Sequence, residues 1–438
     1  MRKVNRERTR INRREALRRI AALAAGATGL QAAHTLAFGE AEPGRPNILL
    51  LVADDLGYGD VSCYGAKDIR TPNIDSLASE GVRFSQFYVS TPLCAPMRVS
   101  MMTGRYPLRT SLSHNPNFKD HEDGLSPDET TIAEVLKNAG YSTGLIGKWH
   151  LGYAPKFRPR RQGFDEYFGF LSGWADYYKH TYNEGTKWMF LNDEPHDEEG
   201  YMTELLARHA IDFLARHRGK RFFLEVAFNA PHFPDQAPDE YVKRSKRGVY
   251  GAMVECLDDN IGRILKHLRG IGLERKTLVI FVSDNGAEAR GSNGPLRGRK
   301  GSLWEGGIRV PFIARWPGRI PAGRVSHELA VSMDIFSTIV AAGAAELPKD
   351  VTIDGKNVLP VMEGEVKSPH EILFWSHEGQ SAVRRGRWKL VRDRKNNSFL
   401  YDLDGHVGEA KDLAPGNPEI VRELSEMLDA WLKEVRQR

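Results

Sequence analysis

The sequence lacks any long hydrophobic run beyond its first 45 residues. A helix needs about 20 consecutive apolar residues to cross a bilayer, and no stretch after residue 45 has that length. Hydrophobic residues make up 41% of the 438 residues and charged residues 27%, the ordinary range of water-soluble domains. We therefore expect no integral membrane segment in the body of the chain. Its length allows one large core with a smaller attached domain.

Cysteine is also scarce, with three residues at positions 63, 94 and 256. Small secreted domains that depend on disulfides contain a whole framework of paired cysteines, so this chain is not of that class. Cys63 and Cys256 are most simply interpreted as small buried apolar side chains, although a single bridge between them stays open. Cys94 differs because it lies in a segment rich in functional groups.

The body of the chain has no large excess of charge of either sign. The formal net charge is +5, but residues 1–37 contain nine Lys and Arg against two Glu. That segment carries +7, so the remainder carries −2. Nucleic-acid-binding domains need a basic surface that neutralises phosphates. A nearly neutral body removes the main argument for that class, and we expect no nucleic-acid partner.

Residues 1–37 have the layout of an export signal. A basic start is followed by a weakly apolar stretch at 20–30 and then by small residues, as in secretory signals. The run Arg-Arg-Glu-Ala-Leu at 13–17 is similar to a twin-arginine signal, the bacterial route for exporting folded proteins. The alternative is a disordered basic tail. The export interpretation predicts a periplasmic or extracellular protein.

Four continuous apolar runs predict buried parallel strands, because strands covered on both faces do not alternate in polarity. Helical segments lie between them, with caps, first-turn prolines or closing glycines at their ends. This alternation predicts an α/β fold in which helices sandwich a mostly parallel sheet. We expect strands at 47–53, 141–146, 222–228 and 277–282, and helices at 72–80, 128–138, 201–216 and 250–268.

The pattern changes near residue 366. From about Ile372 onward, short strand-like pieces alternate with turn residues, and a final helix is expected at 418–435. This pattern predicts a small α+β domain in which a helix covers one face of an antiparallel sheet. The predicted divisions are an export signal at 1–37, a large α/β domain at 44–365 and a C-terminal domain at 366–438.

Polar side chains follow each of the four predicted strands. In open α/β sheets, ligands bind at the carboxyl ends of the strands, so four polar sets placed there predict one convergent site. One Asp pair alone would more simply be a turn or a helix cap, and a lone His a structural residue. The residues, in chain order, are Asp54 and Asp55, Lys148 and His150, His232, and Asp284 and Asn285.

The pairs Asp54-Asp55 and Asp284-Asn285 offer only oxygen atoms as ligands. Hard oxygen donors suit Ca²⁺ or Mg²⁺, whereas zinc prefers His or Cys ligands. Three carboxylates with one amide oxygen fit the flexible coordination of calcium. Binding of a transition metal through His150 and His232 is a less favoured alternative.

The segment 91–105 contains the remaining cysteine, in Thr-Pro-Leu-Cys-Ala-Pro-Met-Arg. Pro96 suits a first helical turn, which places Cys94 at the amino end of a helix. Exposed amides and the helix dipole favour an anion there, and Arg98 adds a planar, permanently charged fork. A plain cysteine could also be activated at such a place, so a thiolate enzyme stays an open alternative.

Several motifs occur along the chain in a fixed order. The most specific are Cys-Ala-Pro-Met-Arg at 94–98 and the stretch from Arg299 to Pro311. The others lie at 46–57, 147–152, 230–234, 283–286 and 400–403. In this combination the chain resembles the sulfatase family, within the alkaline-phosphatase-like fold. The resemblance covers nearly all of the chain from Pro46 to about Leu413.

The resemblance implies two cofactors. Cys94 would be oxidised to formylglycine by a formylglycine-generating enzyme, and the hydrate of this aldehyde would be the nucleophile. The family usually has Ser where this chain has Met97, but the Cys, Pro and Arg that the modifying enzyme is expected to need are present. The resemblance also implies one Ca²⁺, held by Asp54, Asp55, Cys94, Asp284 and Asn285.

The mechanistic hypothesis gives roles to the remaining polar residues. Arg98, Lys148 and Lys300 would hold the sulfate oxygens and stabilise developing charge. His232, with Lys300, would protonate the leaving oxygen as general acid. His150 would withdraw the proton that lets sulfate leave. The expected catalytic set is Cys94, Arg98, Lys148, His150, His232 and Lys300.

The expected substrate is a sulfated small molecule or, more favoured, a sulfated glycan. The chain resembles arylsulfatases and the sulfatases that act on amino-sugar sulfates, and an exported enzyme would meet extracellular polysaccharide. One loop offers the stacking and hydrogen-bonding groups of a sugar subsite, although it could equally be a packed surface turn. Its residues are Trp174, Asp176, Tyr177, Tyr178 and His180.

Two rival functions stay open. One is a phosphodiesterase or phosphonate hydrolase of the same superfamily, which can share the formylglycine and the metal ligands. The set Lys148, His150, His232 and Lys300 favours the more weakly charged sulfate ester. The other rival is a non-catalytic glycan-binding protein whose Cys94 is never modified.

Overall fold

The computed structural model describes residues 44–187 and 189–436. From Arg45 onward, contacts within the chain form a single unit. The export signal expected at 1–37 lies outside the described residues and stays a prediction. Among the described helices, none is long and apolar enough to cross a bilayer.

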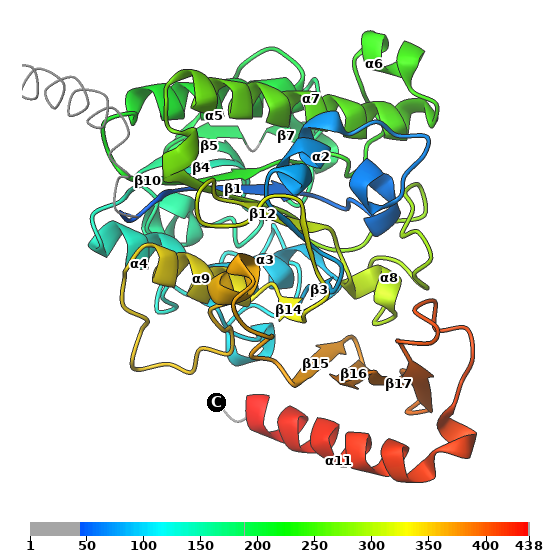
Figure 1. Cartoon of the computed structure of the whole chain (residues 1–438). Coiled ribbons are helices and arrows are strands. Elements are labelled where there is room, and N and C mark those ends of the chain that lie inside the picture. The colour runs from blue at the N-terminus through cyan, green and yellow to red at the C-terminus, as the bar shows by residue number, and fades with distance from the viewer. Residues whose placement is uncertain (1–43, 188, 437–438) are drawn as a thin grey trace, which may run out of the picture. The chain divides into compact units, whose positions relative to one another are not determined.

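Within the described residues, ten strands form one mixed sheet (Figure 1). The strands are β1 (Asn47–Ala53), β2 (Val82–Phe84), β4 (Ser142–Lys148), β5 (Glu166–Phe170), β8 (Met189–Leu191), β9 (Glu194–Pro195), β10 (Phe222–Ala227), β11 (Thr277–Ser283), β12 (Phe312–Arg315) and β13 (Arg324–Ser326). Their order across the sheet is β13-β2-β12-β11-β1-β10-β4-β5-β8-β9. The central members β11, β1, β10, β4 and β5 are parallel; the first four were predicted and β5 was not.

The register of the central strands brings their carboxyl ends to one level. Ala53 pairs with Ser283, and Val52 pairs with Ala227. Ala227 in turn pairs with Gly147 in β4. The residues that follow these pairs therefore leave the sheet at the same edge, where parallel sheets bind their ligands.

Successive residues of β1 enter two cores on opposite faces of the sheet. Ile48, Leu50 and Val52 belong to one apolar cluster, and Leu49 and Leu51 belong to the other. All five side chains are fully buried. Because both faces of the strand are covered, its sequence is continuously apolar instead of alternating.

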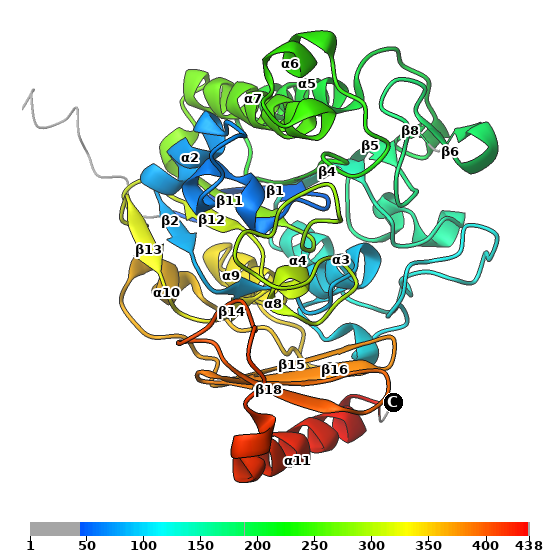
Figure 2. The same cartoon turned by 90° about the vertical axis from the view of Figure 1, so that its right-hand side faces the viewer.

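Helices cover both faces of this sheet (Figures 1 and 2). They are α2 (Pro72–Ser79), α3 (Cys94–Thr103), α4 (Ile132–Asn138), α5 (Met202–Arg216), α6 (Asp239–Arg244), α7 (Gly248–Gly270), α8 (Glu305–Ile308), α9 (Asp334–Ala342) and α10 (Leu359–Glu363). The apolar residues of α2, α5 and α7 join one cluster, and those of α3, α4 and α9 join the other. The predicted layered α/β architecture is thus confirmed.

The C-terminal region forms its own small sheet. Its strands β15 (Ile372–His377), β16 (Gln380–Arg385), β17 (Trp388–Arg392) and β18 (Ser398–Asp402) pair antiparallel in chain order. Helix α11 (Pro418–Val435) packs against β16 and β17. The predicted antiparallel sheet with one helix is confirmed. Trp375 joins this sheet to the large domain by donating from Nε1 to the carbonyl of Val89, the residue after β3 (Phe87–Tyr88), at 2.7 Å.

Some details differ from the sequence prediction. Helix α4 begins at Ile132, four residues later than expected, because Thr131 caps it in a capping box with Glu134. The short outer strands were missed because strands of two to five residues carry too little periodicity. Two pairs of short strands, β3 (Phe87–Tyr88) with β14 (Ala330–Val331) and β6 (Thr181–Tyr182) with β7 (Thr186–Lys187), lie outside both larger sheets. Cys63 and Cys256 are free thiols.

Candidate active site

Four strand ends bring polar side chains together at the carboxyl edge of the large sheet. Asp54 and Asp55 follow β1, and Asp284 follows β11. Lys148 is the last residue of β4, and His232 lies in the loop after β10. All five side chains are buried. The fold therefore assembles the residues that the sequence prediction placed in one site.

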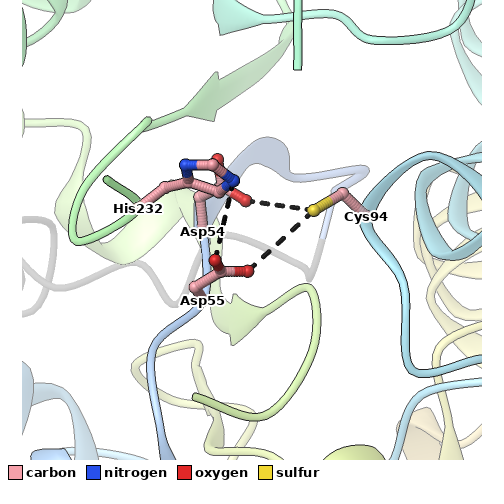
Figure 3. Close-up of side chains that lie close together, drawn as sticks. All are labelled: Asp54, Asp55, Cys94 and His232. Carbon is pink, nitrogen blue, oxygen red and sulfur yellow. Dashed lines mark hydrogen bonds and ion pairs between the residues drawn. The ribbon is translucent and has the colours of Figure 1, made fainter. Parts of the chain in front are cut away.

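Cys94 is the first residue of α3, and its thiol points at both carboxylates of the Asp pair (Figure 3). Its Sγ lies 3.5 Å from Oδ1 of Asp54 and 3.9 Å from Oδ1 of Asp55. Burial raises the pKa of the Cys94 thiol, because a thiolate loses its hydration there. The unmodified side chain is therefore a thiol at neutral pH, which disfavours a plain thiolate enzyme.

The Asp55 carboxylate has three partners from distant segments. The ammonium of Lys300 lies 2.7 Å from Oδ1, and Nδ2 of Asn285 donates to the same oxygen at 2.7 Å. Nε2 of His232 lies 3.6 Å from Oδ2. The backbone of Asp55 has a φ of 64°, an uncommon left-handed conformation at a site where function can demand it.

Arg98 and Lys148 pair with the other two carboxylates. A terminal guanidinium nitrogen of Arg98 donates to Oδ2 of Asp284 at 2.9 Å. Nζ of Lys148 donates to Oδ2 of Asp54 at 2.6 Å. With Asp55 and Lys300, the site contains three carboxyl groups and three cationic side chains. A bound divalent cation would add positive charge to this set and attract an anionic ester.

The buried carboxylates act on one another electrostatically. Burial and the neighbouring charge of Asp284 raise the pKa of Asp54 well above its ordinary value. Burial opposes ionisation of Asp284 as well, but the positive charges of Arg98 and Lys148 outweigh it and lower its pKa. Carboxylates that repel one another in a buried site are stabilised when a cation binds between them.

The donor set fits a bound cation. One ligand atom from each of Asp54, Asp55, Cys94 and His232 lies within 4.8 Å of all the others. Oδ1 of Asn285 is buried and has no hydrogen-bond partner within the described residues. A buried amide oxygen without a donor is costly, and a cation would satisfy it. Two carboxylates and this amide oxygen favour a hard ion such as calcium.

The tautomer of His232 also supports a bound cation at this site. Its Nδ1 lies 2.9 Å from the carbonyl oxygen of Phe233, which can only accept, so Nδ1 carries the hydrogen. Burial lowers the pKa of His232 to about 3, although the Asp55 carboxylate opposes this. The neutral ring therefore turns the lone pair of Nε2 toward an oxygen of Asp55. A proton or a cation is needed between two such acceptors.

His150 is a neutral base at the edge of this cluster. Burial and the charges of Lys148 and Arg98 lower the pKa of His150 well below its ordinary value. Its Nδ1 is buried without a hydrogen-bond partner among the described groups. The ring fits because residue 173 is glycine: a Cβ there would lie 2.7 Å from Nε2. His150 is not part of the four-residue metal group.

The loop expected to bind sugar is used largely for structure. The hydroxyl of Tyr177 is buried and donates to the carbonyls of Asn229 and His232, at 2.9 Å each. His180 is also buried and contacts the carbonyl of Gly200. The Asp176 carboxylate accepts from backbone amides of its own turn. These three side chains therefore hold the loop and the His232 backbone.

Sequence reasoning missed Gly173 and the structural role of Tyr177. No local pattern marks either one, since each acts on a residue that is distant along the chain. It also left out Phe233, although this residue lies inside the predicted Ala-Pro-His-Phe-Pro motif. Its ring lies against that of His232, with 4.4 Å between their centroids.

Two family models match the chain. One is described as Sulfatase and matches residues 46–344. The other is described as N-sulphoglucosamine sulphohydrolase, C-terminal, and matches residues 299–438. The chain belongs to the sulfatase family. This sulfatase is therefore a sulfuric ester hydrolase, as the sequence motifs predicted.

Curated relatives match over most of their length. The sulfatase is 37% identical to N-acetylgalactosamine-6-sulfatase of Canis lupus familiaris, over 79% of this chain and 72% of that protein. It is 37% identical to arylsulfatase A of Homo sapiens, over 90% of this chain and 89% of that protein. It is 36% identical to steryl-sulfatase of Rattus norvegicus, over 76% of this chain and 73% of that protein.

Solved structures show the same fold. Ps i-CgsB in complex with k-i-k-neocarrahexaose superposes with a TM-score of 0.84 at 33% identity, covering 88% of this chain and 92% of that one. The phosphonate monoester hydrolase of Agrobacterium radiobacter gives a TM-score of 0.68 at 20% identity, covering 89% of this chain and 96% of that one. At that identity the second likeness concerns the fold alone. The alkaline-phosphatase-like fold predicted for the sulfatase is confirmed.

Proposed function

We propose that this sulfatase hydrolyses the sulfate ester of a carbohydrate to an alcohol and inorganic sulfate, with formylglycine at position 94 and one Ca²⁺ as cofactors. The observation that carries the proposal is the place of Cys94. Its Sγ lies 3.5 Å and 3.9 Å from two buried carboxylates, in a cluster that also contains three cations. A nucleophile and the charges that hold an anionic ester thus meet at one point.

Five residues would hold the calcium ion: Asp54, Asp55, Asp284, Asn285 and the modified residue 94. The free Oδ1 of Asn285 supports this assignment. Bound calcium would supply positive charge that lowers the pKa of the nucleophile and neutralises the sulfuryl oxygens. In the described structure, Arg98 already occupies one oxygen of Asp284 at 2.9 Å, so that carboxylate would serve both cations.

Formylglycine is proposed because a buried thiol is poorly suited to the reaction. Its hydrate supplies two hydroxyl groups, one to attack sulfur and one whose deprotonation releases sulfate. The Cys-Ala-Pro-Met-Arg segment would be the substrate of the formylglycine-generating enzyme. The amino end of α3 at this position favours a negatively charged reacting group.

Arg98, Lys148 and Lys300 would hold the sulfate oxygens. Burial opposes the charged forms of Arg98 and Lys300, but neighbouring acidic groups outweigh it: Asp284 and Asp54 raise the pKa of Arg98, and Cys94 and Asp55 raise the pKa of Lys300. Cations fixed in advance stabilise charge that develops in the transition state without costly reorganisation. The side chain of Lys300 is 13% exposed, whereas that of Lys148 is fully buried.

His232 would protonate the leaving oxygen, with Lys300 beside it. The ring is neutral in the free site because burial lowers its pKa to about 3. A bound sulfate ester adds negative charge, which raises the proton affinity of a neighbouring imidazole. His232 would therefore acquire its proton when the substrate binds. Tyr177 supports this position by holding the His232 carbonyl at 2.9 Å.

His150 would act as the base that lets sulfate leave. A base must be unprotonated at working pH, and burial keeps the pKa of His150 well below its ordinary value. Its Nδ1, which has no partner within the described residues, is available to accept a proton. The two histidines thus divide the acid and base roles between them.

The carbohydrate substrate is proposed from the relatives and the expected location. The curated relatives include N-acetylgalactosamine-6-sulfatases, and Ps i-CgsB was solved with a neocarrahexaose. We further propose that residues 1–37 direct export to the periplasm or beyond. The catalytic domain would comprise residues 44–365 and the C-terminal domain residues 366–438.

One experiment separates this function from its rivals. The peptide that contains residue 94 should be about 18 Da lighter than its cysteine form when formylglycine is present. The modified protein should turn over 4-nitrophenyl sulfate faster than a 4-nitrophenyl phosphate diester. Faster turnover of the diester would identify a phosphodiesterase instead. An unmodified peptide in a host that has the modifying enzyme would point to a non-catalytic binding protein.

A further inference from the structure

A row of aromatic rings begins at His232 and leads away from the site. The ring centroid of His232 lies 4.4 Å from that of Phe233, and the Phe233 centroid lies 5.3 Å from that of Trp174. Trp174 is 5.1 Å from Tyr182, and Tyr182 is 5.6 Å from Phe118. The rings come from three separate segments, so only folding produces the row.

The row is exposed to solvent at Phe233, and its far end, Phe118, packs against the core. Phe233 is 39% exposed, whereas the adjoining His232 is 5% exposed. Trp174, Tyr182 and Phe118 are half-buried. Phe233 is one of six exposed large hydrophobic side chains among the described residues, and its ring lies against His232 of the buried polar cluster. Exposed apolar surface next to a reactive site commonly binds a ligand.

The position of Phe233 relates the row to the leaving group. His232 is the proposed proton donor to the leaving oxygen, and Phe233 is the next residue. Lys300, the most exposed of the three cations in the site, contacts Asp55 together with His232. The organic part of a bound sulfate ester would therefore extend from His232 over the ring of Phe233.

Cations lie at both ends of the row. Nζ of Lys119 lies 5.4 Å from the ring centroid of Phe118. The guanidinium carbon of Arg290 lies 5.9 Å from that of Phe233, and this guanidinium also pairs with Asp235 and Glu288. Apolar ring faces flanked by cations suit a ligand with apolar faces and negative charges. Sulfated sugars have both, since the C–H groups of a sugar ring form an apolar face and its sulfates are anions.

We infer that Phe233, Trp174, Tyr182 and Phe118 form a binding surface for a sulfated oligosaccharide. Sugar rings beyond the one that loses its sulfate would stack on this aromatic row. The inference rests on the proposed function and deepens it: the enzyme recognises several sugars of a glycan, and not only the sulfated ring. Because stacking acts equally on bound substrate and transition state, it contributes to KM more than to kcat.

The test compares saccharides with an aryl ester in the full-length, formylglycine-containing enzyme. Phe233→Ala and Trp174→Ala are assayed on a panel of sulfated mono- to hexasaccharides from carrageenan and chondroitin sulfate, and on 4-nitrophenyl sulfate. We expect KM for hexasaccharides to rise about tenfold or more, with a smaller rise for monosaccharides and the smallest for the aryl ester. Trp174→Phe should restore most of the loss.

Trp388→Ala is the matched control, because Trp388 is a half-buried tryptophan on β17 with a guanidinium over its ring. It should leave the ratio of saccharide to aryl turnover unchanged. Equal losses on every substrate in the Phe233 and Trp174 variants would overturn the inference. So would a wild-type enzyme that turns over the aryl ester and no saccharide in the panel. If the modified wild-type enzyme turns over no sulfate ester at all, the proposed function itself fails.

Discussion

The ring of His150 occupies the space that a side chain at position 173 would need. A Cβ on Gly173 would lie 2.7 Å from both Nε2 and Cε1 of that ring. The backbone of Gly173 is not in the left-handed region, so contact with His150, and not backbone strain, accounts for the glycine. The proposed base can therefore take up its position only because residue 173 has no side chain.

Gly173→Ala should lower kcat about a hundredfold, because a displacement of about 1 Å in a catalytic group can cost that much. Steady-state kinetics on 4-nitrophenyl sulfate would measure the loss, and KM should change little. Gly219→Ala is the control, since a Cβ on Gly219 meets nothing within 4 Å. Wild-type turnover in Gly173→Ala would show that His150 tolerates displacement or has no role.

Cys94→Ser should transfer sulfate once and then stop. Serine has one hydroxyl, so after sulfation no second hydroxyl remains to expel sulfate. Intact mass after incubation with substrate should show one added sulfo group per chain, and Cys94→Ala should show none. Continuous sulfate release by the serine variant is the outcome that contradicts the formylglycine scheme.

His232→Ala should affect poor leaving groups more than good ones. A general acid contributes about a hundredfold to ten-thousandfold when the leaving oxygen needs a proton, as a sugar alkoxide does. We expect such a loss on sugar sulfates and a much smaller one on 4-nitrophenyl sulfate, whose phenolate leaves unaided. The exposed His406 provides the control, His406→Ala. A uniform loss on both substrates would argue for a binding role.

Removal of calcium should abolish activity and lower the melting temperature, and added calcium should restore both. A ligand that binds only the folded state stabilises it by about 2.7 kcal/mol at a hundredfold excess over Kd. Asn285→Ala removes the unpartnered amide oxygen and should require more calcium for the same thermal shift. Asp404→Asn, a change at an exposed carboxylate, should leave the calcium concentration needed for that thermal shift unchanged. The idea fails if chelators change neither quantity.

Glu225→Gln should stabilise the protein above pH 7. Burial raises the pKa of Glu225 to about 7, against the opposing charge of Arg98, and Oε2 has no hydrogen-bond partner within the described residues. A carboxyl whose pKa is raised by folding favours the folded state at low pH, and this contribution is lost progressively as pH rises from about 4.5 to about 7.

At pH 8 the free energy of unfolding of Glu225→Gln should exceed that of the wild type by on the order of 3 kcal/mol. This difference should vanish near pH 4. Urea unfolding of both proteins at several pH values would measure it. Glu240→Gln, at an exposed carboxyl, controls for the change in net charge. A difference between Glu225→Gln and wild type that does not vary with pH would refute the assigned pKa.

Much of the site could be predicted from local sequence. The strand 47–53 was evident because residues buried on both faces form a continuous apolar run. Since parallel strands end at one edge, the polar residues behind the strands could be expected to meet there. Cys94 could be placed at a helix start because Pro96 fits a first turn.

The loop 174–180 shows where that reasoning stopped. Its composition suited a sugar subsite, yet Tyr177 and His180 are buried and hold backbone carbonyls. Trp174 instead faces Phe233 across a centroid distance of 5.3 Å. Composition gives the kinds of contact that a side chain can make, but not which neighbour it will meet.

The sequence alone determined the long buried strands, the main helices and the chemical groups, because local backbone preferences and burial patterns repeat along such elements. Tertiary structure decided which residues meet. Lys148 pairs with Asp54 and Lys300 with Asp55, and the ring of His150 lies against the backbone of Gly173. Such pairings join segments far apart in the chain. They depend on how whole layers pack, and no local pattern records that.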